Sequence, residues 1–122
     1  MRRLRTRAQF QALLGQPPVA RTAHFALHRL NPVDPALFDG VGAWWLGAMA
    51  PKRWARRAVT RNSIRRQIYS VGQTLRPPSS TVAYLVRLRA EFSRAQFPSA
   101  DSIALRRAVR EELLRLFARG AD

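Results

Sequence analysis

The densest group of side chains with a chemical use lies in one stretch, residues 52–69, which reads KRWARRAVTRNSIRRQIY. This stretch holds seven Lys or Arg residues and no acid. Guanidinium and ammonium groups bind phosphate oxygens, and a guanidinium group also stacks on aromatic rings. The chemistry on offer is therefore recognition of a polyanion, with nucleic acid as the first candidate.

Residues for other kinds of chemistry are missing or badly placed. The chain has no Cys, which excludes a thiol nucleophile, a thiolate metal site and a disulfide. His24 and His28 fall on a predicted strand, where four residues span about 13 Å, so they cannot chelate one ion. The acids are scattered over loops and one helix, away from the basic stretch. We therefore predict binding rather than catalysis, with no catalytic residue and no metal or other cofactor held by side chains.

The charge of the whole chain supports this reading. The 122 residues carry a formal charge of +15, and none of the seven acids lies in residues 1–33 or 40–90. Such a balance indicates a polyanionic partner, either a nucleic acid or a membrane surface. No apolar segment follows the basic N-terminus, and no run approaches the ~20 apolar residues of a membrane span. A cytoplasmic protein is expected.

The basic stretch is expected to form a helix from about Trp54 or Ala58 to Val71, with Gly72 just past its end. On a 3.6-residue period, Ile64, Ile68 and Val71 share one face, which would be buried. The other face would carry Arg61, Asn62, Arg65 and Arg66. Because the apolar face is narrow enough to be used up by the core, a membrane-surface helix is the weaker alternative.

Two elements before this helix supply aromatic side chains. A helix over Arg7–Leu14, capped by Thr6 and Gln9, would present Phe10. A strand over 20–30 would point Phe25 toward either the core or a cleft. For Phe10, too, a place in the core is the more common outcome for a lone Phe on a helix.

A second strand, over 41–50, contains adjacent tryptophans. Trp44 and Trp45 must point to opposite faces, so we expect one in the core and the other partly exposed or against a ligand. Gly47 would let a backbone or a nucleotide approach closely.

The rest of the chain completes one small domain over residues 1–122. A strand is expected over 81–89 and a helix over 102–119, the latter with Glu111 and Glu112 facing water. The order α-β-β-α-β-α predicts an α+β fold with one layer of helices on a mainly antiparallel sheet and a βαβ crossover.

The basic stretch resembles the RNR signature of the bacterial ribonuclease P protein component. In that family a basic pair follows a strand, and Ala-Val-x-Arg-Asn-x-(Ile/Leu)-(Lys/Arg)-Arg follows on a helix. The matching residues here are Lys52, Arg53, Ala58, Val59, Arg61, Asn62, Ile64, Arg65 and Arg66. Ser63 stands where many members have a second Arg, so one phosphate contact would be lost. The resemblance also implies a left-handed crossover.

The resemblance implies a function and a set of partners. The protein would be an accessory subunit of the ribonuclease P endonuclease, in which an RNA subunit with Mg²⁺ removes the 5′ leader of precursor tRNA. The residues assigned to the catalytic RNA are Lys52, Arg53, Arg57, Arg61, Asn62, Arg65 and Arg66. The residues assigned to a cleft for the single-stranded leader are Phe10, Phe25, Trp44 and Trp45. A structural RNA binder like a ribosomal protein is the alternative, because its composition would look the same.

Overall fold

Three helices and five strands lie in the residues that the structure, a computed structural model, describes: 1–39, 43–76, 78 and 81–121. In chain order they are β1 (Arg2–Arg3), α1 (Arg7–Leu14), β2 (Ala20–Arg21), β3 (Phe25–Leu30), β4 (Trp45–Met49), α2 (Ala58–Thr74), β5 (Ala83–Leu88) and α3 (Ile103–Gly120). The α-β-β-α-β-α order and the α+β class are confirmed, and a two-residue strand, β1, adds to them. The single strand predicted over 20–30 is instead two strands, β2 and β3, which pair antiparallel with each other. Residues 41–42 of the predicted second strand lie outside the described residues.

Helix α1 forms because its first turn caps itself. The Thr6 hydroxyl accepts a hydrogen bond from the Gln9 backbone N–H at 3.2 Å, and the Gln9 side chain accepts one from the Thr6 N–H at 3.1 Å. These bonds satisfy donors that a helix start leaves free. The predicted bounds of this helix are confirmed.

Helix α2 is longer than predicted. Gly72 lies inside it rather than past its end, and the helix continues to Thr74. A Cβ at this glycine would collide with the side chain of Leu46 in β4. The glycine therefore serves close packing of helix on sheet and not termination.

The sheet has the strand order β1-β4-β5-β3-β2 and is mixed. Strand β4 pairs in parallel with both β1 and β5, whereas β3 pairs antiparallel with β2 and β5. The parallel pairing of β4 with β5 confirms the βαβ unit around α2, and the handedness of that unit stays a prediction. The sheet is thus less antiparallel than predicted, because the N-terminal segment adds β1 as a parallel edge strand. The sequence of β1, two arginines, contains no pattern that would predict a strand.

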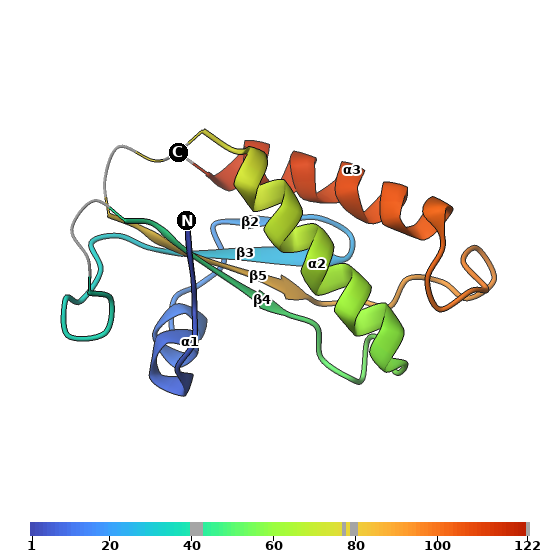
Figure 1. Cartoon of the computed structure of the whole chain (residues 1–122), viewed down its shortest axis with the longest axis horizontal. Helices are drawn as coiled ribbons and strands as arrows, with labels where there is room; N and C mark the ends of the chain where they lie inside the picture. The colour runs from blue at the N-terminus through green and yellow to red at the C-terminus, as the bar shows by residue number, and fades with distance from the viewer. Residues whose placement is uncertain (40–42, 77, 79–80, 122) are drawn as a thin grey trace.

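The helices cover both faces of the sheet (Figure 1). Helices α2 and α3 lie on one face, over a core that includes Tyr84 and Val86 of β5. Helix α1 lies on the other, over a smaller core that includes Ala83 and Leu85. The prediction of one helical layer was wrong, because both faces of β5 are apolar and each needs a cover.

A buried carboxylate ties α3 to the turn between β2 and β3. Glu112, predicted to face water, is 5% exposed. It accepts hydrogen bonds from the Thr22 hydroxyl at 2.6 Å and the His24 backbone N–H at 2.7 Å, and it contacts His24 Nδ1 at 2.7 Å. Burial alone would raise the pKa of Glu112, but the hydrogen bonds from Thr22 and His24 outweigh it and lower the pKa. The His24 ring also stacks on Phe92 with centroids 3.8 Å apart.

Candidate nucleic-acid interface

Helix α2 presents one buried face and one cationic face, as predicted. Ile64 and Val71 are at most 1% exposed, while Asn62 and Arg66 are exposed. Within the described part of the chain, the ion pairs of the structure include none of the arginines of α2. The positive charge of this helix is therefore available to a partner.

Short hydrogen bonds hold the signature side chains in place. Arg61 donates to the carbonyls of Ala55 and Arg56 at 3.0 and 2.7 Å, which fixes the loop to the helix that follows it. Arg65 donates to the Asn62 side-chain oxygen at 2.6 Å. Asn62 thus makes a local contact within α2, and the guanidinium of Arg65 is oriented before any ligand arrives.

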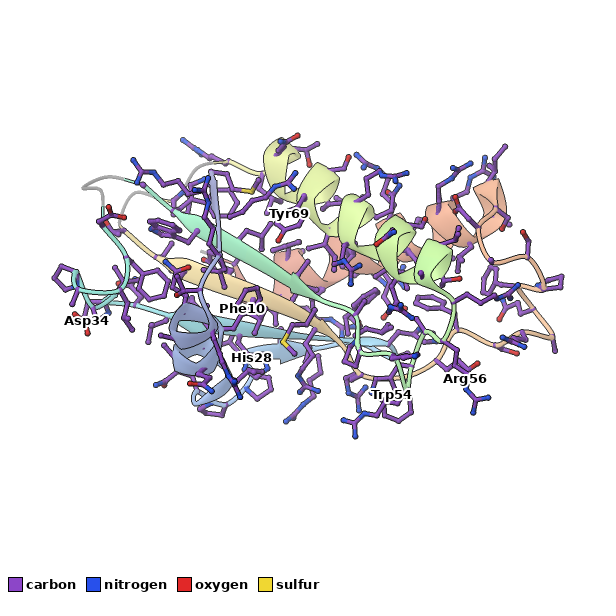
Figure 2. The ribbon with its side chains drawn as sticks, turned by 60° about the horizontal axis from the view of Figure 1, so that its bottom comes forward. Phe10, His28, Asp34, Trp54, Arg56 and Tyr69 are labelled. Carbon is purple, nitrogen blue, oxygen red and sulfur yellow. The ribbon has the colours of Figure 1, made fainter. Side chains whose placement is uncertain are left out.

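The loop between β4 and α2 extends the cationic surface. Trp54 and Ala55 both donate their backbone N–H groups to the Pro51 carbonyl, at 3.0 and 3.1 Å, which closes a tight turn. Lys52 and Arg53 are exposed on it, and the Arg53 guanidinium lies 5.0 Å from the centre of the Trp54 ring. Figure 2 shows Trp54 and Arg56 projecting from this loop.

Arg56 and Arg57 are two further exposed arginines of this loop. Arg57 is exposed and donates to the Pro98 carbonyl at 3.3 Å. Arg56 is exposed as well, although it was not among the residues assigned to the RNA from the sequence.

A groove of about 520 Å³ lies between α1 and the C-terminal end of β4. It is lined by Arg7, Phe10, Gln11 and Leu14 of α1, by residues 48–51, and by Arg65 of α2. The groove therefore brings a predicted cleft residue, Phe10, together with a predicted signature residue, Arg65. Sequence reasoning missed Arg7, although its position three residues before Phe10 puts both on one helix face.

The other three predicted cleft residues do not reach this groove. Phe25 is 0% exposed in the core under α2 and α3, on the opposite face of the sheet. Trp44 and Trp45 do point to opposite faces, but they are only 7% and 5% exposed. Trp45 packs edge-on against Phe38 with centroids 5.6 Å apart. The prediction that Phe25, Trp44 and Trp45 line the cleft was wrong, because helices pack on both faces of the sheet and bury these side chains.

Two small residues also have roles other than those predicted. Gly47 makes room for the chain itself, since a Cβ there would lie 2.9 Å from Leu4 Cγ and 3.1 Å from Phe10 Cε1. Ser63, at the position of the missing signature Arg, is 4% exposed and donates to Asp101 Oδ1 at 2.9 Å. This serine therefore joins α2 to the segment before α3 and does not face a ligand.

The two histidines serve separate parts of the structure. His24 contacts Glu112 of α3, whereas His28 Nδ1 donates to the Gln16 carbonyl at 2.8 Å, beyond the end of α1. The described residues contain no group of three His, Asp or Glu side chains that could hold a metal ion. In that same part of the chain, no helix is long and apolar enough to cross a membrane.

Known proteins resemble this chain in sequence and in fold. The family model for ribonuclease P matches residues 1–117. The ribonuclease P protein component of Ralstonia pickettii is 35% identical over 116 residues, which is 94% of this chain and 76% of the relative. That of Burkholderia pseudomallei is 32% identical over 113 residues, 93% of this chain and 77% of the relative.

Two solved structures share the fold at lower identity. The RNase P protein of Thermotoga maritima superposes with a TM-score of 0.69 at 20% identity, covering 100% of both chains. The Staphylococcus aureus RNase P protein gives a TM-score of 0.68 at 20% identity, covering 97% of this chain and 94% of that one. These two likenesses bear on the fold alone. The family model and the curated relatives show that the chain belongs to the ribonuclease P protein family, whose members are the protein component of that endoribonuclease.

Proposed function

We propose that this protein binds the catalytic RNA of ribonuclease P through α2 and the preceding loop, and takes the 5′ leader of precursor tRNA in the groove beside α1. The observation that carries the proposal is that Arg65 belongs to both places. It stands on the cationic face of α2 and lines the groove next to Phe10. In the proposed complex, a single guanidinium would border both the catalytic RNA and the precursor tRNA.

The cationic surface suits a folded RNA partner. Its members are Lys52, Arg53, Arg57, Arg61, Asn62, Arg65 and Arg66. Like charges spaced four apart on a helix repel by a few tenths of a kcal/mol per pair, and phosphate groups would remove that repulsion. Arg61 and Arg65 are already fixed by local hydrogen bonds, so less side-chain entropy is lost when phosphates bind.

The groove suits a single strand. Phe10 offers an aromatic face on which a base can stack, and Arg7 and Arg65 offer charge to the backbone. Stacking and phosphate contacts carry little sequence information. Such a groove would accept leaders of many sequences.

The chemistry would lie in the RNA. In the proposed complex the RNA subunit, with Mg²⁺, cleaves the phosphodiester bond, and the protein positions the leader and neutralises phosphate charge. The protein would act in the cytoplasm with its RNA.

A cleavage assay tests the proposal. Purified protein is added to the ribonuclease P RNA of the same source at low Mg²⁺, with precursor tRNA as substrate. We expect the protein to restore leader removal and to cleave nothing without the RNA. Arg65→Gln should reduce the restored rate, whereas Arg115→Gln, which removes an equal charge from an exposed site on α3, should not.

Two outcomes would contradict the proposal. RNA binding without any change in cleavage would favour a purely structural RNA binder. Equal losses for Arg65→Gln and Arg115→Gln would mean that net charge, and not this surface, carries the effect.

A further inference from the structure

Helices α2 and α3 run side by side and in the same direction over the face of the sheet opposite to α1 (Figure 1). Two side-chain contacts join them along their length. Ser63 of α2 donates to Asp101, just before α3, at 2.9 Å, and Arg110 of α3 donates to the hydroxyl of Ser70 in α2 at 3.5 Å. We call the line between these contacts the seam of the two helices.

Three arginines border this seam. Arg66 lies on α2 three residues after Ser63 and four before Ser70, a spacing that puts all three on one helix face. Arg106 and Arg110 lie four residues apart on α3, so they also share a face. Arg66, Arg106 and Arg110 are the seam arginines.

The charge at the seam is unbalanced. Arg106 Nη1 lies 3.4 Å from Asp101 Oδ2, and 42% of the Arg106 side chain is exposed. Arg66 and Arg110 make no ion pair within the described residues. The residues three and four positions from either of them along its helix include no acid. In the described part of the chain, three guanidiniums therefore meet one carboxylate at the seam, and a bound anion would relieve their repulsion.

The other arginines of α3 have other surroundings. Arg107 and Arg115 lie four residues before and after Glu111, a spacing at which opposite charges on a helix attract. Arg119 donates to the Arg21 carbonyl at 2.7 Å, which fastens the end of α3 to β2. The excess positive charge of α3 is thus found on the side that faces α2.

The position of the seam indicates which polyanion would bind there. Arg65 and Arg66 are consecutive, so their side chains project about 100° apart around α2. Arg65 lines the groove beside α1, whereas Arg66 lies on the face that meets α3. The body of α2 therefore separates the seam from the groove proposed for the leader. The seam instead adjoins the surface assigned to the catalytic RNA, to which Arg66 also belongs.

We propose that the seam arginines bind backbone phosphates of the catalytic RNA, so that α3 extends the RNA-binding surface of α2. This inference rests on the proposed function and adds to it a helix that carries none of the predicted RNA-binding residues. Asp101 holds Arg106 beside α2, and Arg110 lies about 6 Å farther along the axis of α3. A planar guanidinium can donate two parallel hydrogen bonds to one phosphate.

The test measures binding of the purified protein to the ribonuclease P RNA of the same source, without precursor tRNA, over a series of salt concentrations. Arg106→Gln and Arg110→Gln should each weaken binding by about threefold to tenfold and reduce the log–log salt slope by about 0.7 to 0.9. Arg115→Gln, an exposed control on the same helix that projects about 140° away from Arg110, should do neither. Thermal unfolding of each variant shows whether its fold is kept.

A second comparison separates a phosphate contact from a purely structural link. Arg106→Gln and Asp101→Asn break the same ion pair, but only Arg106→Gln removes a positive charge. We expect Arg106→Gln to weaken RNA binding and Asp101→Asn to bind at least as tightly as the parent, because the latter removes a carboxylate that repels phosphate. Equal losses of affinity for the two variants would show that Arg106 only links the helices, and would overturn the inference.

Failure of this inference can be told from failure of the proposed function. If Arg106→Gln and Arg110→Gln bind RNA like the parent while Arg65→Gln still reduces cleavage, the RNA contact ends at α2 and the proposed function stands. If their losses appear only with leader-bearing precursor, the seam holds precursor tRNA and the inference is overturned. If Arg65→Gln leaves the restored cleavage rate unchanged, the proposed function itself fails, whatever the seam variants do.

Discussion

Two phenylalanines that look alike in the sequence should behave in opposite ways when truncated. Phe25→Ala should strongly lower the stability of the fold, so that any change in RNA binding reflects unfolding and not a lost contact. Phe10→Ala should leave the fold largely intact and weaken binding of leader-bearing precursor. The difference follows from their surroundings, since Phe25 is 0% exposed under α2 and α3, whereas Phe10 is partly buried at the edge of the groove.

The magnitude for Phe25 comes from its burial. Truncating a fully buried Phe costs about 3–5 kcal/mol, as lost apolar burial plus the cavity left behind. Here the lost contacts include Phe92, whose ring centre lies 6.0 Å away. An unfolding entropy of about 2.1 cal/mol/K per residue gives roughly 0.26 kcal/mol/K for 122 residues, so a loss of about 4 kcal/mol lowers Tm by about 15 °C.

The magnitude for Phe10 comes from stacking. A base on an aromatic ring is worth about 1–3 kcal/mol, and a loss near 2 kcal/mol would weaken precursor binding about thirtyfold. Mature tRNA has no leader and should bind the variant holoenzyme like the parent. The Tm of Phe10→Ala should fall by only about 5 °C or less, because part of that ring is already in water.

The measurements are thermal unfolding followed by circular dichroism, and equilibrium binding of precursor and mature tRNA to the holoenzyme. Leu88→Ala, a second fully buried position in the same core as Phe25, is the control for destabilisation alone. The reasoning is refuted if Phe25→Ala keeps its Tm within a few degrees of the parent. It is also refuted if Phe10→Ala weakens precursor and mature tRNA equally.

Three further predictions concern the carboxylate network, the signature serine and salt. Glu112→Ala should lower the free energy of unfolding in urea by about 3 kcal/mol, because it leaves buried hydrogen-bond donors unpaired. Glu111→Ala, at the exposed neighbouring position, should lower it by less than about 0.5 kcal/mol. Since the folded-state pKa of Glu112 is lowered, its carboxylate stabilises the fold fully above the unfolded-state pKa of about 4.3, and this stabilisation is lost as pH falls through the folded-state pKa. The free energy of unfolding of Glu112→Gln should therefore depend less on pH below pH ~5 than that of the parent, and parallel curves for the two proteins would contradict this. Ser63→Ala should destabilise the fold by about 1 kcal/mol through the lost bond to Asp101, yet bind the catalytic RNA within about twofold of the parent; a larger loss of affinity would return this position to the interface. Affinity for the catalytic RNA should fall with salt at a log–log slope of roughly −0.7 to −0.9 per phosphate contact, and a flat salt dependence would rule out phosphate recognition.

The features that could be predicted from sequence are those fixed by close neighbours in the chain. The capping box at Thr6 and Gln9 sets the start of α1, and its bounds are confirmed. The periodicity of Ile64, Ile68 and Val71 identifies the buried face of α2, and the arginines of the helix lie outside that face. Such patterns act over one or two helical turns and do not depend on the rest of the fold.

The burial of the aromatic residues could not be predicted from local patterns. Alternation along a strand correctly put Trp44 and Trp45 on opposite faces, but it cannot say whether a face is covered. Coverage depends on where α1 packs, and α1 lies on the face away from α2 and α3 (Figure 1). The sequence therefore predicts a ligand contact for Phe25, whereas the structure shows it to be a core residue.

By itself the sequence determined the fold class, the basic helix with its buried and cationic faces, and the polyanionic kind of partner, because propensity, periodicity and charge are local properties of the chain. Only the tertiary structure decided which aromatic ring borders the groove and that Arg7 and Arg65 share it. Those neighbours come from α1, from α2 and from the end of β4, which packing and strand register bring together over long sequence distances. A shift of one residue in register would send each side chain to the opposite face, and no local pattern sets that register.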